Sequence, residues 1–133
     1  MEASLLATER RLVLLGSVFG FLSVAIGAFG AHMLKARLDA TGFKAVFETG
    51  VQYQMAHSLA LLFLAGLSER IIPSAKIKVV GLLFAIGIII FSGSLYLLAV
   101  TGINLFGAIT PLGGLAFMAG WIILAVSAAR RES

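Results

Sequence analysis

The longest uncharged run of this sequence extends from Val79 to Ala129 without a single Asp, Glu, Lys or Arg. A helix that crosses a bilayer needs about 20 mostly apolar residues, because the hydrocarbon core is roughly 30 Å thick and a helix rises about 1.5 Å per residue. The run is therefore too long for one crossing and fits two with a turn between them. The residues Thr101-Gly102-Ile103-Asn104 are typical of turns and predict where the chain reverses.

Two further uncharged runs, Leu12–Ala31 and Thr49–Ser68, have the length of one crossing each. We therefore expect an all-α protein, a four-helix transmembrane bundle that forms one membrane domain over residues 1–133. The expected spans are about 12–31, 49–68, 79–100 and 110–129. Pro111 then falls in the first turn of the last helix, where its missing N–H breaks no hydrogen bond. A barrel is excluded because the runs are continuous rather than alternating, and the first run is longer than the apolar part of a cleaved signal peptide.

The composition agrees with a membrane protein and excludes other classes. Hydrophobic residues make up 60 % of the chain and charged residues only 12 %, about half the charge of a soluble domain. The net charge of +4 comes from basic residues in short groups between the apolar runs, so a soluble fold, a disordered tail and a nucleic-acid partner are excluded. The absence of cysteine removes disulfides, thiolate metal sites and cysteine nucleophiles.

The basic residues predict an orientation in the membrane. Short cytoplasmic loops hold the excess of Lys and Arg in multi-pass proteins. With four spans, one side holds both termini, the 69–78 loop and most of the basic residues: Arg10, Arg11, Arg70, Lys76, Lys78, Arg130 and Arg131. We expect both termini to be cytoplasmic. Lys35, Arg37 and Lys44 on the far side are a mild conflict with this rule.

The far side also carries an amphipathic segment from His32 to Glu48, between the first two spans. Apolar residues recur there at helical spacing on either side of Gly42: Met33, Leu34 and Leu38, then Phe43, Val46 and Phe47. This pattern is typical of one or two short helices in the membrane interface. The segment is either a plain linker or a functional lid.

Small residues at four-residue spacing mark the faces on which membrane helices pack closely. We expect such helix-packing positions at Gly16, Gly20 and Gly27 in the first span and at Gly120 in the last. The contact that they make is either within the monomer or between copies. Trp121 lies near the middle of the last span and is interpreted as a packing anchor.

Nearly all polar residues within the spans fall in their outer halves: His32, Gln52, Tyr53, Gln54, His57, Ser92, Ser94, Tyr96 and Thr110. Tyr53 and Gln54 share a helical face with His57, since they are four and three residues away from it. Polar groups within a membrane usually face the bundle interior or a wet cavity. Two interpretations stand: a small binding cavity with His57 at its base, or hydrogen bonds that hold the helices together.

The pattern contains no recognisable catalytic or cofactor site. His32 and His57 differ in depth by about two helical turns and no carboxylate lies in a span, so neither a metal nor a haem is expected. No Gly-x-Ser-x-Gly elbow is present, and an enzyme is not expected. Proton-coupled transport usually relies on a buried Asp or Glu, and we find no internal repeat of the kind that transporters contain.

Four blocks of the sequence resemble a known family. They are Gly27–His32 (GAFGAH), residues 47–54 (FETGVQYQ) with His57, residues 91–97 (FSGSLYL), and residues 109–114 (ITPLGG) with Gly120-Trp121. In this order they resemble the YgdD/YwdK-like family of small bacterial inner-membrane proteins, a domain of unknown function whose eukaryotic relatives are called transmembrane protein 256. The resemblance implies a four-span inner-membrane protein and implies no activity.

The expected partner of the protein is the lipid bilayer, and two alternative functions remain. The first is an accessory or interaction protein that docks on a larger membrane complex or forms a homo-oligomer, through the Gly16/Gly20 stripe and the amphipathic segment. The alternative is small-molecule or lipid binding, or transport, at the polar residues of the outer half. A closed, hydrogen-bonded interior favours the first, and an open cavity of a few hundred Å³ favours the second.

Overall fold

The computed structural model describes residues 1–67 and 69–130, and these residues form helices and turns with no strand. The helices are α1 (Glu2–His32), α2 (Lys35–Thr41), α3 (Lys44–Ala65), α4 (Ser74–Gly87), the π-helical turn η1 (Ile88–Ser92), α5 (Gly93–Thr101) and α6 (Leu105–Arg130). The all-helical prediction is confirmed. Long apolar runs favour this outcome because a helix satisfies its backbone N–H and C=O groups within itself.

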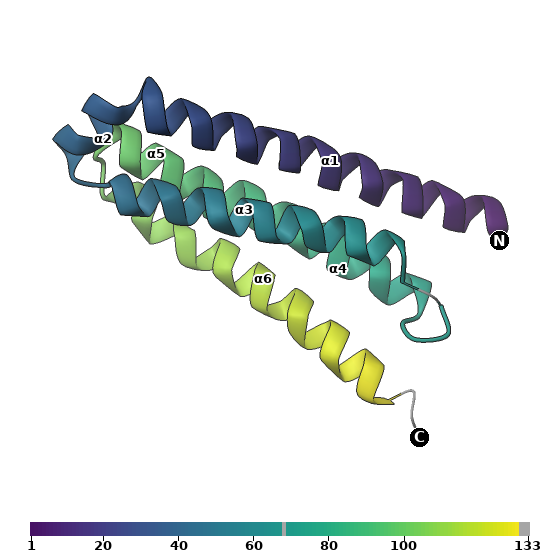
Figure 1. Cartoon of the computed structure of the whole chain (residues 1–133). Coiled ribbons are helices and arrows are strands. Elements are labelled where there is room, and N and C mark those ends of the chain that lie inside the picture. Colours follow the sequence, from purple (N-terminus) through teal and green to yellow (C-terminus); the bar gives the residue numbers. More distant parts are fainter. Residues whose placement is uncertain (68, 131–133) are drawn as a thin grey trace.

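Four long rods lie side by side (Figure 1). The amino terminus, the α3–α4 loop and the carboxyl end of α6 share one end of the molecule, called the inner end below. The opposite, outer end holds α2 and the turn from α5 to α6. Helix α1 packs mainly on α3, whereas α6 packs on the α4–η1–α5 rod.

Three helices are long and apolar enough to cross a membrane within the described part of the chain: α1, the continuous rod Ser74–Thr101, and α6. The expected second span corresponds to α3, which has the length but is less apolar because Gln52, Gln54 and His57 lie in it. Its expected end at Ser68 lies outside the described residues, as does Arg131.

The turn expected at Thr101–Asn104 is confirmed. Helix α5 ends at Thr101, Gly102 adopts a φ of 73°, and α6 begins at Leu105. The position expected for Pro111 is wrong, because α6 begins five residues earlier than expected and Pro111 lies inside it. The bond that Pro111 cannot donate would go to the carbonyl of Gly107. One residue earlier, the Thr110 hydroxyl donates to the carbonyl of Phe106 at 3.3 Å. A proline is tolerated at such a place when neighbouring groups compensate for the missing backbone bond.

The amphipathic segment forms one short helix rather than two. Its first half is α2, whereas Lys44–Glu48 is the first part of α3, because Gly42 ends α2 with a φ of 77° and the chain re-enters a helix at once. Helix α2 covers the end of α5: Arg37 donates to the carbonyl of Val100 at 2.7 Å and Thr41 donates to that of Ala99 at 2.8 Å. Carbonyls at a helix C-terminus have no partner within the helix and attract positive charge. This contact gives Arg37 a structural role at the outer end.

Replacing Gly42 by alanine is expected to destabilise the protein by about 1 kcal/mol, because an L side chain at a φ of 77° is strained. The matched control is Gly93→Ala. A Cβ at Gly93 would meet no atom within 4 Å, and its φ of −59° is helical. Unfolding in mixed detergent micelles, followed by circular dichroism, measures both variants. Equal stability of the two would contradict the left-handed turn.

Candidate functional site

The polar residues of the outer half lie mostly in the interior between α3, α5 and α6. The name polar cluster is used here for those whose side chains bond there: Gln54, His57, Ser92, Ser94, Tyr96 and Thr110. Of the remaining candidates, His32 is exposed at the end of α1, Gln52 is exposed on α3, and the Tyr53 side chain is 43 % exposed. Tyr53 takes part through its backbone carbonyl and through its ring, which packs 4.6 Å from that of Phe91.

Gln54 links three helices. Its Nε2 donates to the carbonyl of Phe19 in α1 at 2.9 Å, and its Oε1 accepts the hydroxyl of Tyr96 in α5 at 2.6 Å. Its own carbonyl accepts the hydroxyl of Ser58 at 2.5 Å. An amide side chain used from both ends in this way fixes the register of α3 between its neighbours.

Serine and threonine hydroxyls make further interhelical bonds in this region. Ser92 donates to the carbonyl of Gly50 at 2.7 Å, and Ser94 shares a 2.6 Å hydrogen bond with Thr110 of α6. Ser92 lies in the π turn η1, where an extra residue in the turn changes the direction in which the following side chains point. No feature of the residue pattern indicates this turn.

His57 is a neutral imidazole with both nitrogens occupied. Its Nδ1 lies 2.8 Å from the carbonyl of Tyr53, which can only accept, so Nδ1 carries the proton. The indole N–H of Trp121 can only donate, and it lies 3.0 Å from Nε2. The Phe117 ring stacks on the imidazole at 3.6 Å between centroids, and Phe84 meets it edge-on at 5.1 Å. Aromatic rings thus occupy the space where a cavity with His57 at its base was expected.

Three residues of this network were not among the predicted site residues: Ser23, Ser58 and Trp121. Ser23 donates to the carbonyl of Val51 at 3.0 Å and joins α1 to α3. The signal for Ser23 was its place in the row of small residues on α1, and the signal for Ser58 was its spacing of four from Gln54. Trp121 was interpreted only as a packing anchor, but it is also the hydrogen-bond donor to His57.

The glycines singled out for helix packing make close contacts within the monomer. A Cβ at Gly16 would lie 2.9 Å from the carbonyl oxygen of Ser58, and one at Gly27 would lie 3.2 Å from Val51. A Cβ at Gly120 would lie 2.5 Å from the ring of Phe84, whereas one at Gly20 would make an ordinary contact of 3.8 Å with Ser58. Gly16 and Gly20 therefore face α3. Of the two contacts expected of this stripe, the structure contains the one within the monomer.

The network is complete, and it contains no metal site. No buried side-chain nitrogen or oxygen lacks a partner in residues 1–67 and 69–130. Groups of three or more His, Cys, Asp or Glu that could hold a metal are also absent from those residues. A cavity of about 360 Å³ lies elsewhere, between α1, α2 and α3 at the outer end, and shares with the predicted residues only Gly27 and Gln52.

The bond between Gln54 and Tyr96 can be measured by a double-mutant cycle. Gln54→Leu and Tyr96→Phe are each expected to cost about 1 kcal/mol. Together they should cost less than their sum, by about 0.6 kcal/mol and at most about 1.7 kcal/mol, the range found for such bonds between membrane helices. The free energy of unfolding in micelles gives the coupling, with Gln52→Leu, which breaks no hydrogen bond and should not lower stability, as the control. Additive effects would show that the bond does not form.

Apolar helices of membrane-crossing length, held together by interhelical hydrogen bonds and glycine contacts, define a helical membrane protein. The chain belongs to the family described as "Protein of unknown function (DUF423)", whose model matches residues 26–114. This confirms the resemblance inferred from the four sequence blocks.

The relatives are membrane proteins of similar length. UPF0382 membrane protein YwdK of Bacillus subtilis is 43 % identical over 118 residues, which cover 89 % of this chain and 95 % of that protein. UPF0382 inner membrane protein YgdD of Escherichia coli K12 is 40 % identical over 123 residues, 92 % of each chain. UPF0382 membrane protein SH2409 of Staphylococcus haemolyticus is 44 % identical over 115 residues, 86 % of this chain and 92 % of that one. No solved structure matches the chain.

Proposed function

We propose that the chain crosses the inner membrane four times and has both termini in the cytoplasm. In addition to the three apolar helices, α3 crosses the membrane, as the second span in chain order. The 22 residues of α3 reach about 33 Å along the helix axis, enough to cross the hydrocarbon core. Two of its polar side chains, Gln54 and His57, are buried and hydrogen-bonded inside the bundle, whereas Gln52 and the charged residues Lys44 and Glu48 are exposed nearer its outer end. The start of α1, the end of α6 and the first turns of α4, which carry Lys76 and Lys78, lie at the inner end in Figure 1, which supports the orientation.

Labelling of single cysteines tests this topology, since the chain has no cysteine of its own. In intact cells, an impermeant maleimide is expected to label Asn104→Cys but not Ser4→Cys or Ala75→Cys, which should react only after lysis. If α3 does not cross, the α3–α4 loop moves to the outer side. Labelling of Ala75→Cys without Asn104→Cys would then refute four spans.

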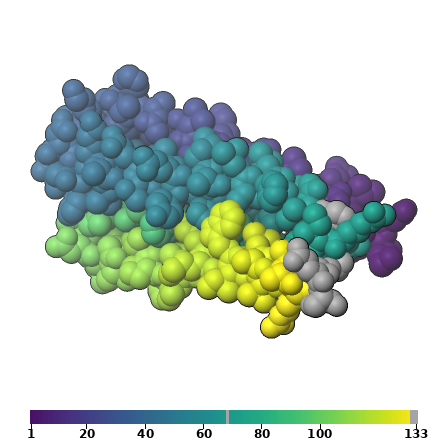
Figure 2. Space-filling model, turned by 60° about the horizontal axis from the view of Figure 1, so that its bottom comes forward, coloured from purple at the N-terminus to yellow at the C-terminus, as the bar shows by residue number. Residues whose placement is uncertain are grey.

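We further propose an accessory role, in which the protein acts through contacts of its outer surface with another membrane protein and not as an enzyme or a channel. This proposal rests on one observation: every buried polar side-chain atom that the structure describes has a hydrogen-bond partner. The hydrogen bonds of the polar cluster are made within the protein, and rings of Phe84, Phe117 and Trp121 fill the space around His57. Figure 2 shows α6 lying directly against the blue-green part of the chain, and the bond from Trp121 to His57 joins α6 to α3. A closed, bonded interior supports a protein whose working surface is outside, with no need of a cofactor.

Photo-crosslinking in living membranes tests the accessory role. A benzophenone amino acid is placed at Phe21 of α1 or Leu115 of α6, whose side chains are 72 % and 59 % exposed. One discrete adduct with a different membrane protein is the expected result. The control is the same amino acid at Phe84, which is fully buried and should give no adduct. Adducts with lipid alone, or only with a second copy of the chain, would refute the role, the second outcome assigning a homo-oligomer instead.

A further inference from the structure

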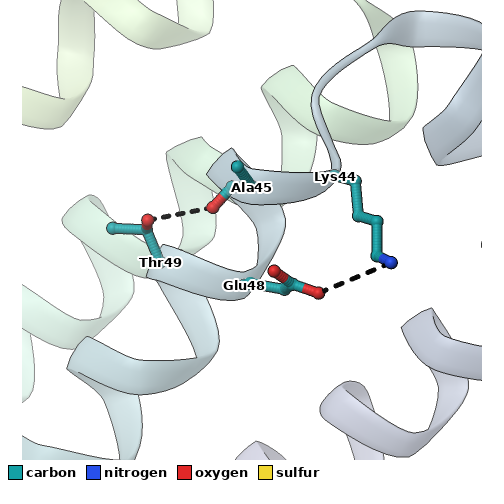
Figure 3. A network of polar contacts seen from close by, with 4 residues as sticks. All are labelled: Lys44, Ala45, Glu48 and Thr49. Carbon is teal, nitrogen blue, oxygen red and sulfur yellow. Dashed lines mark hydrogen bonds and ion pairs between the residues drawn. The ribbon is translucent and has the colours of Figure 1, made fainter.

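The cavity at the outer end is lined by charged groups at its mouth and by small and apolar residues below. Helix α2 contributes Lys35, and the start of α3 contributes Lys44 and Glu48, whereas Gly27 and Gly30 of α1 lie among the lining residues. This part is called the head pocket here. Lys44 and Glu48 are 4.0 Å apart and more than half exposed, so their ion pair is weak and rearranges readily. Figure 3 shows both side chains leaving α3 on one side, with Thr49 on the other.

A second cavity continues the head pocket toward the middle of the molecule. Its volume is about 530 Å³, and it shares Gly27, Val51 and Gln52 with the head pocket. Its other lining residues lie on α1 and α3 and are almost all apolar: Ser23, Val24, Ala28, Met55, Ala56 and Leu59. This part is called the chain groove. The two cavities therefore adjoin at these shared residues and follow one another along the seam between α1 and α3.

The chemistry of these two cavities changes with depth along α3. Lys44, Glu48, Gln52 and Ala56 are spaced by four residues and share one helical face. The charged groups come first, the amide of Gln52 lies about 6 Å below Glu48, and Leu59 lies about 16 Å below it. That last depth is close to half of the roughly 30 Å hydrocarbon core. Charge, neutral polar group and apolar groove follow in the order of a phospholipid's headgroup, ester region and acyl chain.

Gln52 supplies an independent observation. Its side chain is exposed beside the mostly apolar lining of the chain groove, and it forms no hydrogen bond with the residues that the structure describes. An unpaired amide is costly at the edge of the hydrocarbon core. The ester carbonyls of a phospholipid are acceptors at this depth.

We propose that the head pocket and the chain groove together bind one phospholipid with an ethanolamine headgroup. The phosphate lies between the ammonium groups of Lys35 and Lys44, and the ethanolamine ammonium lies on Glu48. The Gln52 amide donates to an ester carbonyl, and one acyl chain follows the chain groove to Leu59. Glu48 selects the headgroup, because a purely anionic lipid brings no cation to this carboxylate. The site is independent of the accessory role, since it uses neither the polar cluster nor the outward faces of Phe21 and Leu115.

Native mass spectrometry of the intact protein in mild detergent tests the site. The probes are phosphatidylethanolamine and phosphatidylglycerol with the same acyl chains. The wild type is expected to bind one phosphatidylethanolamine in preference to phosphatidylglycerol. Lys35→Gln/Lys44→Gln should weaken the binding of both lipids about tenfold, the usual effect of losing a hydrogen bond to a charged group. Glu48→Gln should weaken the binding of phosphatidylethanolamine by a similar factor and leave the binding of phosphatidylglycerol unchanged.

Two further variants separate a specific site from general lipid adhesion. Ala28→Phe places a ring in the chain groove from an exposed position. It should weaken the binding of both lipids without lowering the unfolding midpoint of the protein. Lys76 lies in α4 at the inner end, so Lys76→Gln should not change the binding of either lipid. Equal retention of phosphatidylethanolamine by all variants would overturn the site. A wild-type preference for phosphatidylglycerol would overturn the ethanolamine assignment.

Discussion

Replacing Gly113 by alanine is expected to destabilise the protein by about 3 kcal/mol, the upper part of the usual range for an overpacked contact. Helix α6 meets the π turn at this residue. A Cβ on Gly113 would lie 2.7 Å from the Cα of Phe91 and closer still to its backbone nitrogen. Backbone atoms inside a continuous helix cannot move aside as the end of a side chain can, so the two helices must separate.

Gly114→Ala is the control, because it makes the same chemical change one residue further along α6. A Cβ there would lie 3.8 Å from the ring of Phe91, an ordinary contact. We expect Gly114→Ala to leave the stability unchanged or to raise it slightly, since alanine favours a helix more than glycine does. Unfolding of both variants in mixed micelles gives the comparison. Equal midpoints would show that α6 does not touch the backbone of the π turn.

His57→Ala is expected to cost about 3 kcal/mol, within the range for large-to-small substitutions of buried side chains. The change removes a ring that stacks on Phe117 and contacts Phe84, and it takes away the acceptor of the Trp121 N–H. The bundle has no atoms that can fill the space without moving a helix. A binding residue at the base of an open cavity would instead be lost with little effect on stability.

The role of the indole can be separated with Trp121→Phe, which keeps a ring and removes the donor. Since Trp121 is the only tryptophan, its indole N–H resonance reports on this bond directly. We expect a clear shift of that resonance in His57→Ala and a smaller loss of stability for Trp121→Phe than for His57→Ala. The double variant should cost less than the sum of the two. An unchanged indole resonance in His57→Ala would exclude the bond.

The helical fold and the turn at Thr101–Asn104 could be predicted because both depend on the local sequence. An uncharged run of membrane length has to be helical in lipid, and Gly102 marks the reversal by itself. The sequence left open whether the amphipathic segment forms one short helix or two, and it did not predict the π turn. The first half of the amphipathic segment packs on the carbonyls of α5 through Arg37 and Thr41, and its second half simply continues into α3. The π turn has no signature in the residues Ile88–Ser92 that sequence reasoning could detect.

The sequence by itself determined the class of the protein: a helical membrane protein of its family, with its polar residues at one end of the bundle. Only the tertiary structure decided what those residues do, as Gln52 and Gln54 show. The same side chain, two residues apart on α3, lines the exposed groove between α1 and α3 in one case and bridges Phe19 and Tyr96 in the other. The physical reason is that each partner of Gln54 comes from another helix, 35 and 42 residues away along the chain. The relative register of those helices is set by glycine contacts and the π turn, and no local pattern encodes it.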